Sequence, residues 1–178
     1  MPKSLLNKGL LIALIGIIAD QLSKSYILYG LDLGALYANG LAVVSKLPSG
    51  SIEITSFFNI VLVWNQGVSF GMFNHGEVSE LQPYLLSLLT LTIVGVVTFL
   101  LRKAENVYIA AAYGLVIGGA LGNLIDRILY GAVVDFLDFH IAGKHWPAFN
   151  VADSIILIGV LLLVFEGFFV KDSNHEKS

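Results

Sequence analysis

The chain has 178 residues, of which 56% are hydrophobic and only 13% are charged, and its mean hydropathy is +0.81. Water-soluble domains carry roughly a quarter charged residues, so this composition excludes an ordinary soluble domain and also a disordered chain. A formal net charge of −3 argues against a nucleic-acid partner. The sequence contains no cysteine, which excludes disulfides, thiol nucleophiles and cysteine metal ligands. These features predict an integral membrane protein built as a single domain.

Four segments are long and apolar enough to cross a bilayer, which requires about 20 residues in a helix. They cover approximately residues 9–28, 84–101, 107–125 and 152–170. The first segment could instead be a cleaved signal peptide, but no A-x-A-like site directly follows it, so we expect a retained anchor. The predicted fold class is a mainly α, polytopic membrane protein with four transmembrane helices.

The basic residues near the spans predict which side of the membrane each connection faces, because short loops rich in Lys and Arg stay cytoplasmic. All the basic groups lie on one side only if the chain crosses four times. Both termini are then expected in the cytoplasm of a bacterium, and segments 30–82 and 130–151 outside its cytoplasmic (inner) membrane. The basic groups are Lys3 with Lys8, Arg102 with Lys103, and Lys171 with Lys177.

The two outward segments differ in kind. Residues 51–73 have a strand-like pattern ending in a glycine-rich turn, which predicts a small extracytoplasmic β-sheet on the membrane surface. Residues 31–50 look like a loop or an insertion, and residues 130–150 are short, aromatic and rich in Asp, His and Asn. The tail 172–178 is expected to be disordered.

Charged residues inside a span are costly and call for a reason. Asp20 and Lys24 are four residues apart in the first span, which places them on one helical face as an ion pair. A structural pair near the outer interface is favoured. Substrate contact or support of a nearby site are the alternatives.

The third span has a face of small residues that ends in a polar group. Gly114, Gly118 and Gly122 are spaced by four, which favours close packing between helices in lipid. Three polar residues that can cluster follow at the outer end of the span. They are Asn123, Asp126 and Arg127.

Asp135 and Asp153 form a candidate pair of acids at the outer membrane boundary. Two carboxylates held together in a site of low dielectric share a proton, so that one can activate a water while the other protonates a carbonyl oxygen. Asp126 and Asp138 compete for membership of such a pair. Proton-coupled transport is the rival use of buried carboxylates.

Other catalytic patterns are weaker. Gly67-Val68-Ser69-Phe70-Gly71 matches the G-x-S-x-G elbow, but that motif needs a strand-turn-helix within an α/β-hydrolase sheet. His140 and His145 lie near Asp138, yet a zinc site needs better spacing and usually more ligands. We therefore expect no metal and no cofactor.

Five motifs, in order along the chain, resemble those of the lipoprotein signal peptidase (signal peptidase II) family, which are bacterial membrane aspartyl proteases with four transmembrane helices. The second motif reinterprets the apparent serine elbow. Residues 31–50 are longer than the usual first connection of the family. The motifs are Asp20-Gln21-Leu22-Ser23-Lys24, Asn65-Gln66-Gly67-Val68-Ser69-Phe70, Gly118-Gly119-Ala120-Leu121-Gly122-Asn123-Leu124-Ile125-Asp126-Arg127, Val133-Val134-Asp135-Phe136 and Phe149-Asn150-Val151-Ala152-Asp153.

The resemblance implies a catalytic dyad of Asp135 and Asp153. It implies removal of the signal peptide from diacylglyceryl-modified prolipoproteins, with cleavage just before the lipidated cysteine, and inhibition by globomycin-type compounds. Partners would be these substrates and membrane lipids, without nucleic acid. The residues implied to support the site or contact the substrate are Asn65, Gly67, Asn123, Asp126, Arg127, Asn150, Asp20 and Lys24.

Two other classes of function are kept as alternatives. A small proton-coupled transporter would use the same carboxylates, but it predicts charged residues near the middle of the second and third spans, and both spans lack them. A noncatalytic membrane subunit would tolerate substitution of its Asp residues by Asn. Both make predictions that differ from those of a protease.

Overall fold

The computed structural model describes residues 3–31, 51–67 and 81–169. The predictions made for the loop or insertion at 31–50, for the tail 172–178, and for Val68, Ser69 and Phe70 of the second motif fall wholly or largely outside the described residues. The chain divides into two compact units. The helical unit is Met1–Ala19, Leu88–Gly122 and Ala152–Ser178, and the sheet unit is Asp20–Ser87 and Asn123–Val151.

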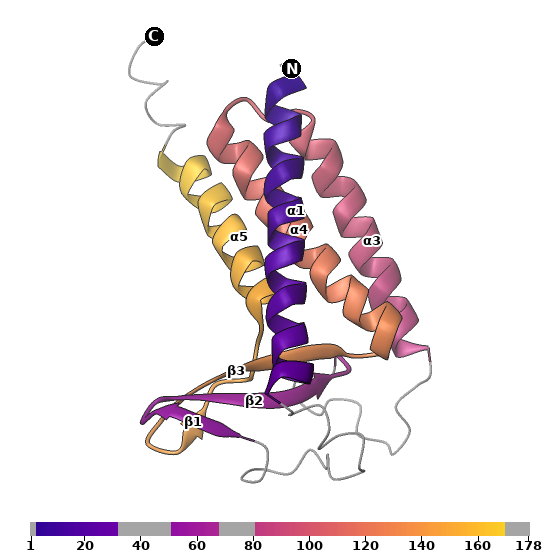
Figure 1. Cartoon of the computed structure of the whole chain (residues 1–178). Helices are drawn as coiled ribbons and strands as arrows, with labels where there is room; N and C mark the ends of the chain where they lie inside the picture. The colour runs from indigo at the N-terminus through magenta and orange to yellow at the C-terminus, as the bar shows by residue number, and fades with distance from the viewer. Residues whose placement is uncertain (1–2, 32–50, 68–80, 170–178) are drawn as a thin grey trace. The chain divides into compact units, whose positions relative to one another are not determined.

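Four long α-helices and one short π-helical segment account for most of the described chain (Figure 1). The predicted spans match the observed helices, except that α1 begins earlier and α4 ends later than predicted. Asp126, placed beyond the predicted span, lies inside α4, where its carboxylate pairs with Lys24. The helices are α1 (Lys3–Ser25), η1 (Tyr26–Gly30), α3 (Gln82–Leu101), α4 (Val107–Tyr130) and α5 (Val151–Phe169).

Three helical stretches among the described residues are long and apolar enough to cross a membrane, namely Ser4–Gly30, Gln82–Leu101 and Val107–Tyr130. Their exposed large hydrophobic side chains fit a lipid environment, since α3 buries only Leu101. The fourth predicted span coincides with α5, and its crossing of the membrane stays a prediction.

Within the helical unit, α4 lies close to α1 and α5 through glycines (Figure 1). A Cβ on Gly118 would stand 2.6 Å from the carbonyl oxygen of Ala13, and one on Gly119 would meet Ala152. These contacts confirm the close packing predicted from the glycine spacing. At the start of α4, the Oδ1 atom of Asn106 accepts a hydrogen bond from the Ile109 amide at 2.9 Å, which caps the helix.

The sheet unit contains a four-stranded antiparallel sheet in the order β1-β2-β3-β4. Strands β1 (Ile52–Thr55) and β2 (Phe58–Asn65) confirm the strand-like pattern of the first outward segment. Strands β3 (Val133–Ile141) and β4 (Lys144–His145) were not predicted. The acidic residues of β3 hide its strand character, because Asp135 and Asp138 are buried against partners from other elements.

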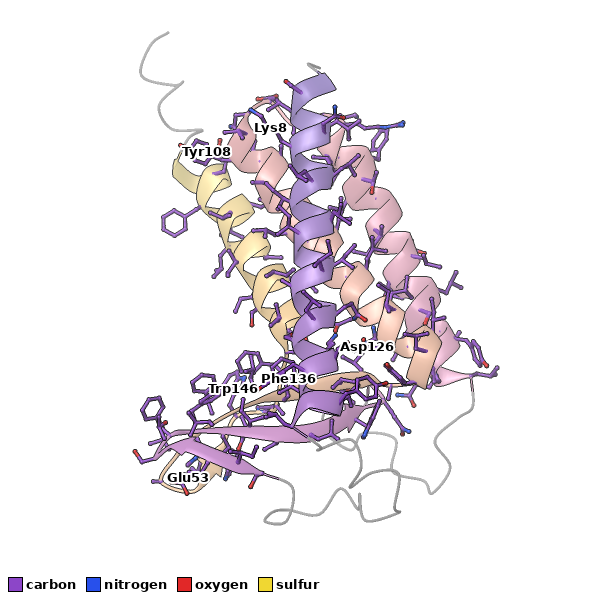
Figure 2. The ribbon with its side chains drawn as sticks, in the orientation of Figure 1. Lys8, Glu53, Tyr108, Asp126, Phe136 and Trp146 are labelled. Carbon is purple, nitrogen blue, oxygen red and sulfur yellow. The ribbon has the colours of Figure 1, made fainter. Side chains whose placement is uncertain are left out.

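An apolar core lies between the end of the first helix and the sheet, within the sheet unit. Ile27 of η1 and Phe136 of β3 are both buried there, and Ile60, Leu62 and Val151 pack against them. Figure 2 labels Phe136 on the ribbon of β3. This core fixes strands β2 and β3 beside η1, and so sets the position of the neighbouring Asp135.

Candidate active site

Asp135 lies on β3 with a side chain that is 1% exposed. Its two carboxylate oxygens accept hydrogen bonds from two amide side chains. The Nδ2 atom of Asn65, at the end of β2, donates to Oδ2 at 2.8 Å, and the Nδ2 atom of Asn150 donates to Oδ1 at 2.7 Å. A buried carboxylate is stable only when such donors replace water, so Asn65 and Asn150 hold Asp135 in one orientation.

Asn150 connects β3 to α4 immediately before α5 begins. Its fully buried side chain reaches the Oδ1 atom of Asn123 at 3.1 Å and the carbonyl oxygen of Val134 at 3.3 Å, in addition to Asp135. Asn123 belongs to the part of α4 in the sheet unit. One amide therefore links the strand that carries Asp135 to the end of a long helix.

The turn after β2 fixes the orientation of the Asn65 amide. Its Oδ1 atom accepts a hydrogen bond from the backbone amide of Gly67 at 2.7 Å, which leaves Nδ2 directed at Asp135. Gly67 has a φ of +91°, and a Cβ there would clash with the side chain of Leu86. The positive φ favours glycine at this position, and any other residue would also require the Leu86 side chain to move.

A buried charge cluster lies next to this carboxylate. The ammonium group of Lys24 is 2.8 Å from Asp20 and 2.7 Å from Asp126, and it donates to Asn123 at 3.1 Å. Lys24 is 2% exposed, and both acids are buried as well. The predicted Asp20–Lys24 ion pair is confirmed, and Asp126 joins it from a helix about a hundred residues later in the chain.

Asp126 ties this charge cluster to the strand that carries Asp135. Its Oδ2 atom accepts a hydrogen bond from the backbone amide of Val134 at 3.0 Å, and its Oδ1 atom accepts one from Gln21 at 2.9 Å. Gln21 lies in the first motif, but the sequence did not predict this contact. Because Val134 directly precedes Asp135, Asp126 helps to position the Asp135 carboxylate.

The two competing carboxylates have strong partners of their own. Asp126 is paired with Lys24, whereas Asp138 accepts a hydrogen bond from Asn59 and lies 2.9 Å from the Nδ1 atom of His145. Sequence reasoning missed the contact of Asn59, since no short spacing connects β2 to β3. Among the acids of β3, the one held by Asn65 and Asn150 is Asp135.

The remaining predicted residues lie near the ends of helices. Arg127 approaches the carbonyl oxygen of Asn123 with its Nη1 atom at 3.4 Å, within α4. Asp153 lies in the first turn of α5, three residues after Asn150, and belongs to the helical unit. Its pairing with Asp135 stays a prediction.

Most of the chain matches a known family. The family model described as Signal peptidase (SPase) II matches residues 12–169. The chain belongs to the signal peptidase II family. The family is a peptidase family, and the transporter alternative finds no support in these matches.

Curated relatives and solved structures agree with this family. The chain is 42% identical to the lipoprotein signal peptidase of Burkholderia vietnamiensis over 87% of this chain and 84% of that protein. It is 45% identical to the lipoprotein signal peptidase of Aeromonas hydrophila over 74% of this chain and 80% of that protein. A solved structure of a bacterial membrane enzyme matches with a TM-score of 0.69 and 31% identity, covering 97% of this chain and 93% of that one. The fold class of a helical membrane protein with a small sheet is thereby confirmed.

Proposed function

We propose that this signal peptidase II is an aspartic endopeptidase that removes the signal peptide from diacylglyceryl-modified prolipoproteins. Cleavage would occur just before the lipidated cysteine. The single observation that carries the proposal is the buried Asp135 carboxylate, held by two asparagines, in a chain of a peptidase family. The relatives named lipoprotein signal peptidase support the class of substrate.

Asp135 and Asp153 would act as a pair that shares one proton. The ionised carboxylate takes a proton from a water molecule while the water oxygen bonds to the carbon of the scissile carbonyl. The protonated partner gives its proton to the carbonyl oxygen. When the tetrahedral intermediate collapses, the carbon–nitrogen bond breaks and the leaving amine takes the proton that the first carboxylate removed from water. The partner carboxylate takes back the proton that it gave to the carbonyl oxygen, so the pair is restored and one water is consumed for each bond cleaved.

The short segment around Asn150 supports this pairing. Asn150 donates to the carboxylate of Asp135, and Asp153 follows three residues later in the first turn of α5. Asn150, which donates to Asp135, and Asp153, the proposed second acid, therefore belong to the same short stretch of chain. Asn65, Asn123, Asp126 and Lys24 would position Asp135 without reacting themselves.

The proposed site lies on the extracytoplasmic side of the bacterial inner membrane. Lys8 of α1 and Tyr108 of α4 lie at the same end of the helical unit (Figure 2), and Arg102 and Lys103 belong to the α3–α4 connection there. Clustered basic residues favour the cytoplasmic side. An inhibitor of the globomycin type would compete with the substrate at the proposed dyad.

The test uses the purified full-length chain and a diacylglyceryl-modified precursor. We expect Asp135→Asn and Asp153→Asn each to abolish release of the signal peptide while the unfolding midpoint stays near that of the unsubstituted protein. Glu53→Gln makes the same chemical change at an exposed acid on β1 and should retain full activity. Normal cleavage by folded Asp135→Asn would reject Asp135 as a reacting acid, whereas no cleavage by the purified unsubstituted chain would favour the noncatalytic alternative.

A further inference from the structure

The two oxygens of the Asp126 carboxylate have different partners. The Oδ2 atom lies 2.7 Å from the ammonium group of Lys24 and accepts a hydrogen bond from the backbone amide of Val134 at 3.0 Å. The Oδ1 atom accepts a hydrogen bond from the side-chain amide of Gln21 at 2.9 Å. Because Asp126 is 1% exposed, water does not readily replace a lost donor there. The Gln21 amide therefore supplies a bond that a buried oxygen needs.

Gln21 also contacts the second acid of the charge cluster. Its amide nitrogen lies 3.2 Å from the Oδ2 atom of Asp20 as well as 2.9 Å from Asp126. These two carboxylates share one ammonium group, that of Lys24, so two like charges lie on either side of it. An amide nitrogen with two hydrogens can stabilise both carboxylates without adding a charge. Gln21 thereby fixes how the Asp126 carboxylate is turned.

The orientation of Asp126 matters because its Oδ2 atom reaches the strand that carries Asp135. Val134, which donates its backbone amide to that oxygen, is fully buried on β3 and directly precedes Asp135. Asn65 and Asn150 hold the carboxylate of Asp135 itself. The two asparagines therefore fix the side chain, whereas Asp126 fixes the backbone from which it extends.

We propose that Gln21 is a positioning residue for Asp135, and that it acts through Asp126 and the backbone amide of Val134. The proposal rests on the proposed function, in which Asp135 is a reacting acid. Without the Gln21 donor, the Asp126 carboxylate turns and its bond to Val134 weakens. A displacement of a reacting group by about 1 Å can lower a rate roughly 100-fold, so a small movement of β3 is enough to reduce catalysis. All four residues belong to the sheet unit.

The test uses the purified full-length chain and a diacylglyceryl-modified precursor. Gln21→Met keeps the approximate length of the side chain but removes its N–H donors. We expect kcat to fall about 10-fold while KM stays within about twofold, because a buried acceptor loses its donor and no substrate contact changes. Ser23→Ala is the matched control, because it removes a hydroxyl of the same helix that donates to the backbone carbonyl of Asp20. Its kcat should be unchanged.

Gln21→Lys makes the opposite change, since it alters the shape of the side chain but keeps N–H donors within reach of Asp126. Gln21 is half-buried, which leaves room for a longer side chain. We expect a kcat about threefold or more above that of Gln21→Met, because hydrogen bonds from a charged donor to a carboxylate are strong. If only the shape of the side chain mattered, Gln21→Met would be the more active variant.

A second measurement needs no substrate. Amide hydrogen exchange reports on the bond between Val134 and Asp126, and NMR of protein with isotope-labelled valine can follow it. Gln21→Met should speed exchange of the Val134 amide about 10-fold, whereas Ser23→Ala should leave it unchanged. This change is expected only if Gln21 acts through Asp126.

Unfolding curves establish that each variant is folded. Normal kcat, or unchanged exchange of Val134, in folded Gln21→Met would overturn the proposal. So would a raised KM at normal kcat, because Gln21 would then contact the substrate. If Gln21→Met does not fold, loss of both kcat and slow Val134 exchange in folded Gln21→Lys has the same meaning. A failure of the proposed function would appear differently, as no cleavage by the unsubstituted chain while the exchange difference between the variants persists.

Discussion

The helical unit and the sheet unit bury different kinds of side chain. The core of the helical unit consists of Ala13, Leu101, Ala104, Ala110 and Ile117. By contrast, every buried polar or charged side chain among the described residues belongs to the sheet unit. They are Asp20, Lys24, Asn59, Asn123, Asp126, Asp135, Asp138 and Asn150.

This difference separates architecture from function. Helices in lipid associate through close packing of small residues, which requires no polar groups. Buried polar groups cost free energy unless they are fully paired, so a chain retains many of them where they perform a task. Apart from Asp153, which we propose as a reacting acid, we expect substitutions in the helical unit to alter mainly stability. Substitutions of the buried polar residues of the sheet unit should alter activity as well.

The largest effect is expected for Lys24→Met. The change leaves Asp20 and Asp126 as buried carboxylates without their shared cation, and breaking a buried pair costs about 3–5 kcal/mol. Chemical unfolding in detergent measures this loss, and activity should fall with it. Lys103→Met removes an exposed lysine that lies over the ring of Phe99, and should cost about 1 kcal/mol or less. Equal losses in the two variants would contradict the role of the charge cluster.

A smaller effect is expected for Asn65→Ala, which removes one hydrogen-bond donor from Asp135. An unsatisfied buried acceptor costs about 1–3 kcal/mol, which corresponds to a roughly 10- to 100-fold lower kcat if Asp135 reacts. Asn59→Ala is the matched control, because it removes an equivalent donor from Asp138 on the same strand pair. It should lower stability without a comparable loss of kcat. The opposite ranking of kcat would point to Asp138 as the reacting acid.

In the helical unit, Gly118→Leu should destabilise the packing of α4 against α1. The new side chain would meet the backbone of Ala13, and overpacking costs about 1–3 kcal/mol. Gly95→Leu on α3 is the control, because no atom lies within 4 Å of a Cβ built there. Thermal unfolding distinguishes the two variants. A Gly118→Leu protein as stable as the Gly95→Leu protein would show that the close approach does not matter.

The smallest effect is expected for His145→Gln on β4. His145 is about one-third exposed, so its bond to Asp138 should contribute about 1 kcal/mol or less. Unfolding measurements at neutral pH test this value, and cleavage should be unaffected. A large loss of activity would mean that the Asp138 cluster belongs to the reactive site.

Much of the site could be predicted because it lies in short motifs. The Asp20–Lys24 pair follows from helical spacing, and the asparagines that hold Asp135 occur in motifs that resemble those of the family. The roles of Gln21 and Asn59 could not be predicted, because their partners Asp126 and Asp138 lie 105 and 79 residues away. Strand β3 was also missed, since its buried acids interrupt the alternation typical of a strand.

The sequence by itself determined the membrane class and the helices, because long apolar runs without charge satisfy their backbone in lipid only as helices. It also singled out Asp135 and Asp153, the acids that we propose to react. Only the tertiary structure decided which partner each acid has: Lys24 for Asp126, His145 for Asp138, and two asparagines for Asp135. The reason is physical, since the free energy of a buried carboxylate depends on the donors that folding brings to it, and these come from distant parts of the chain.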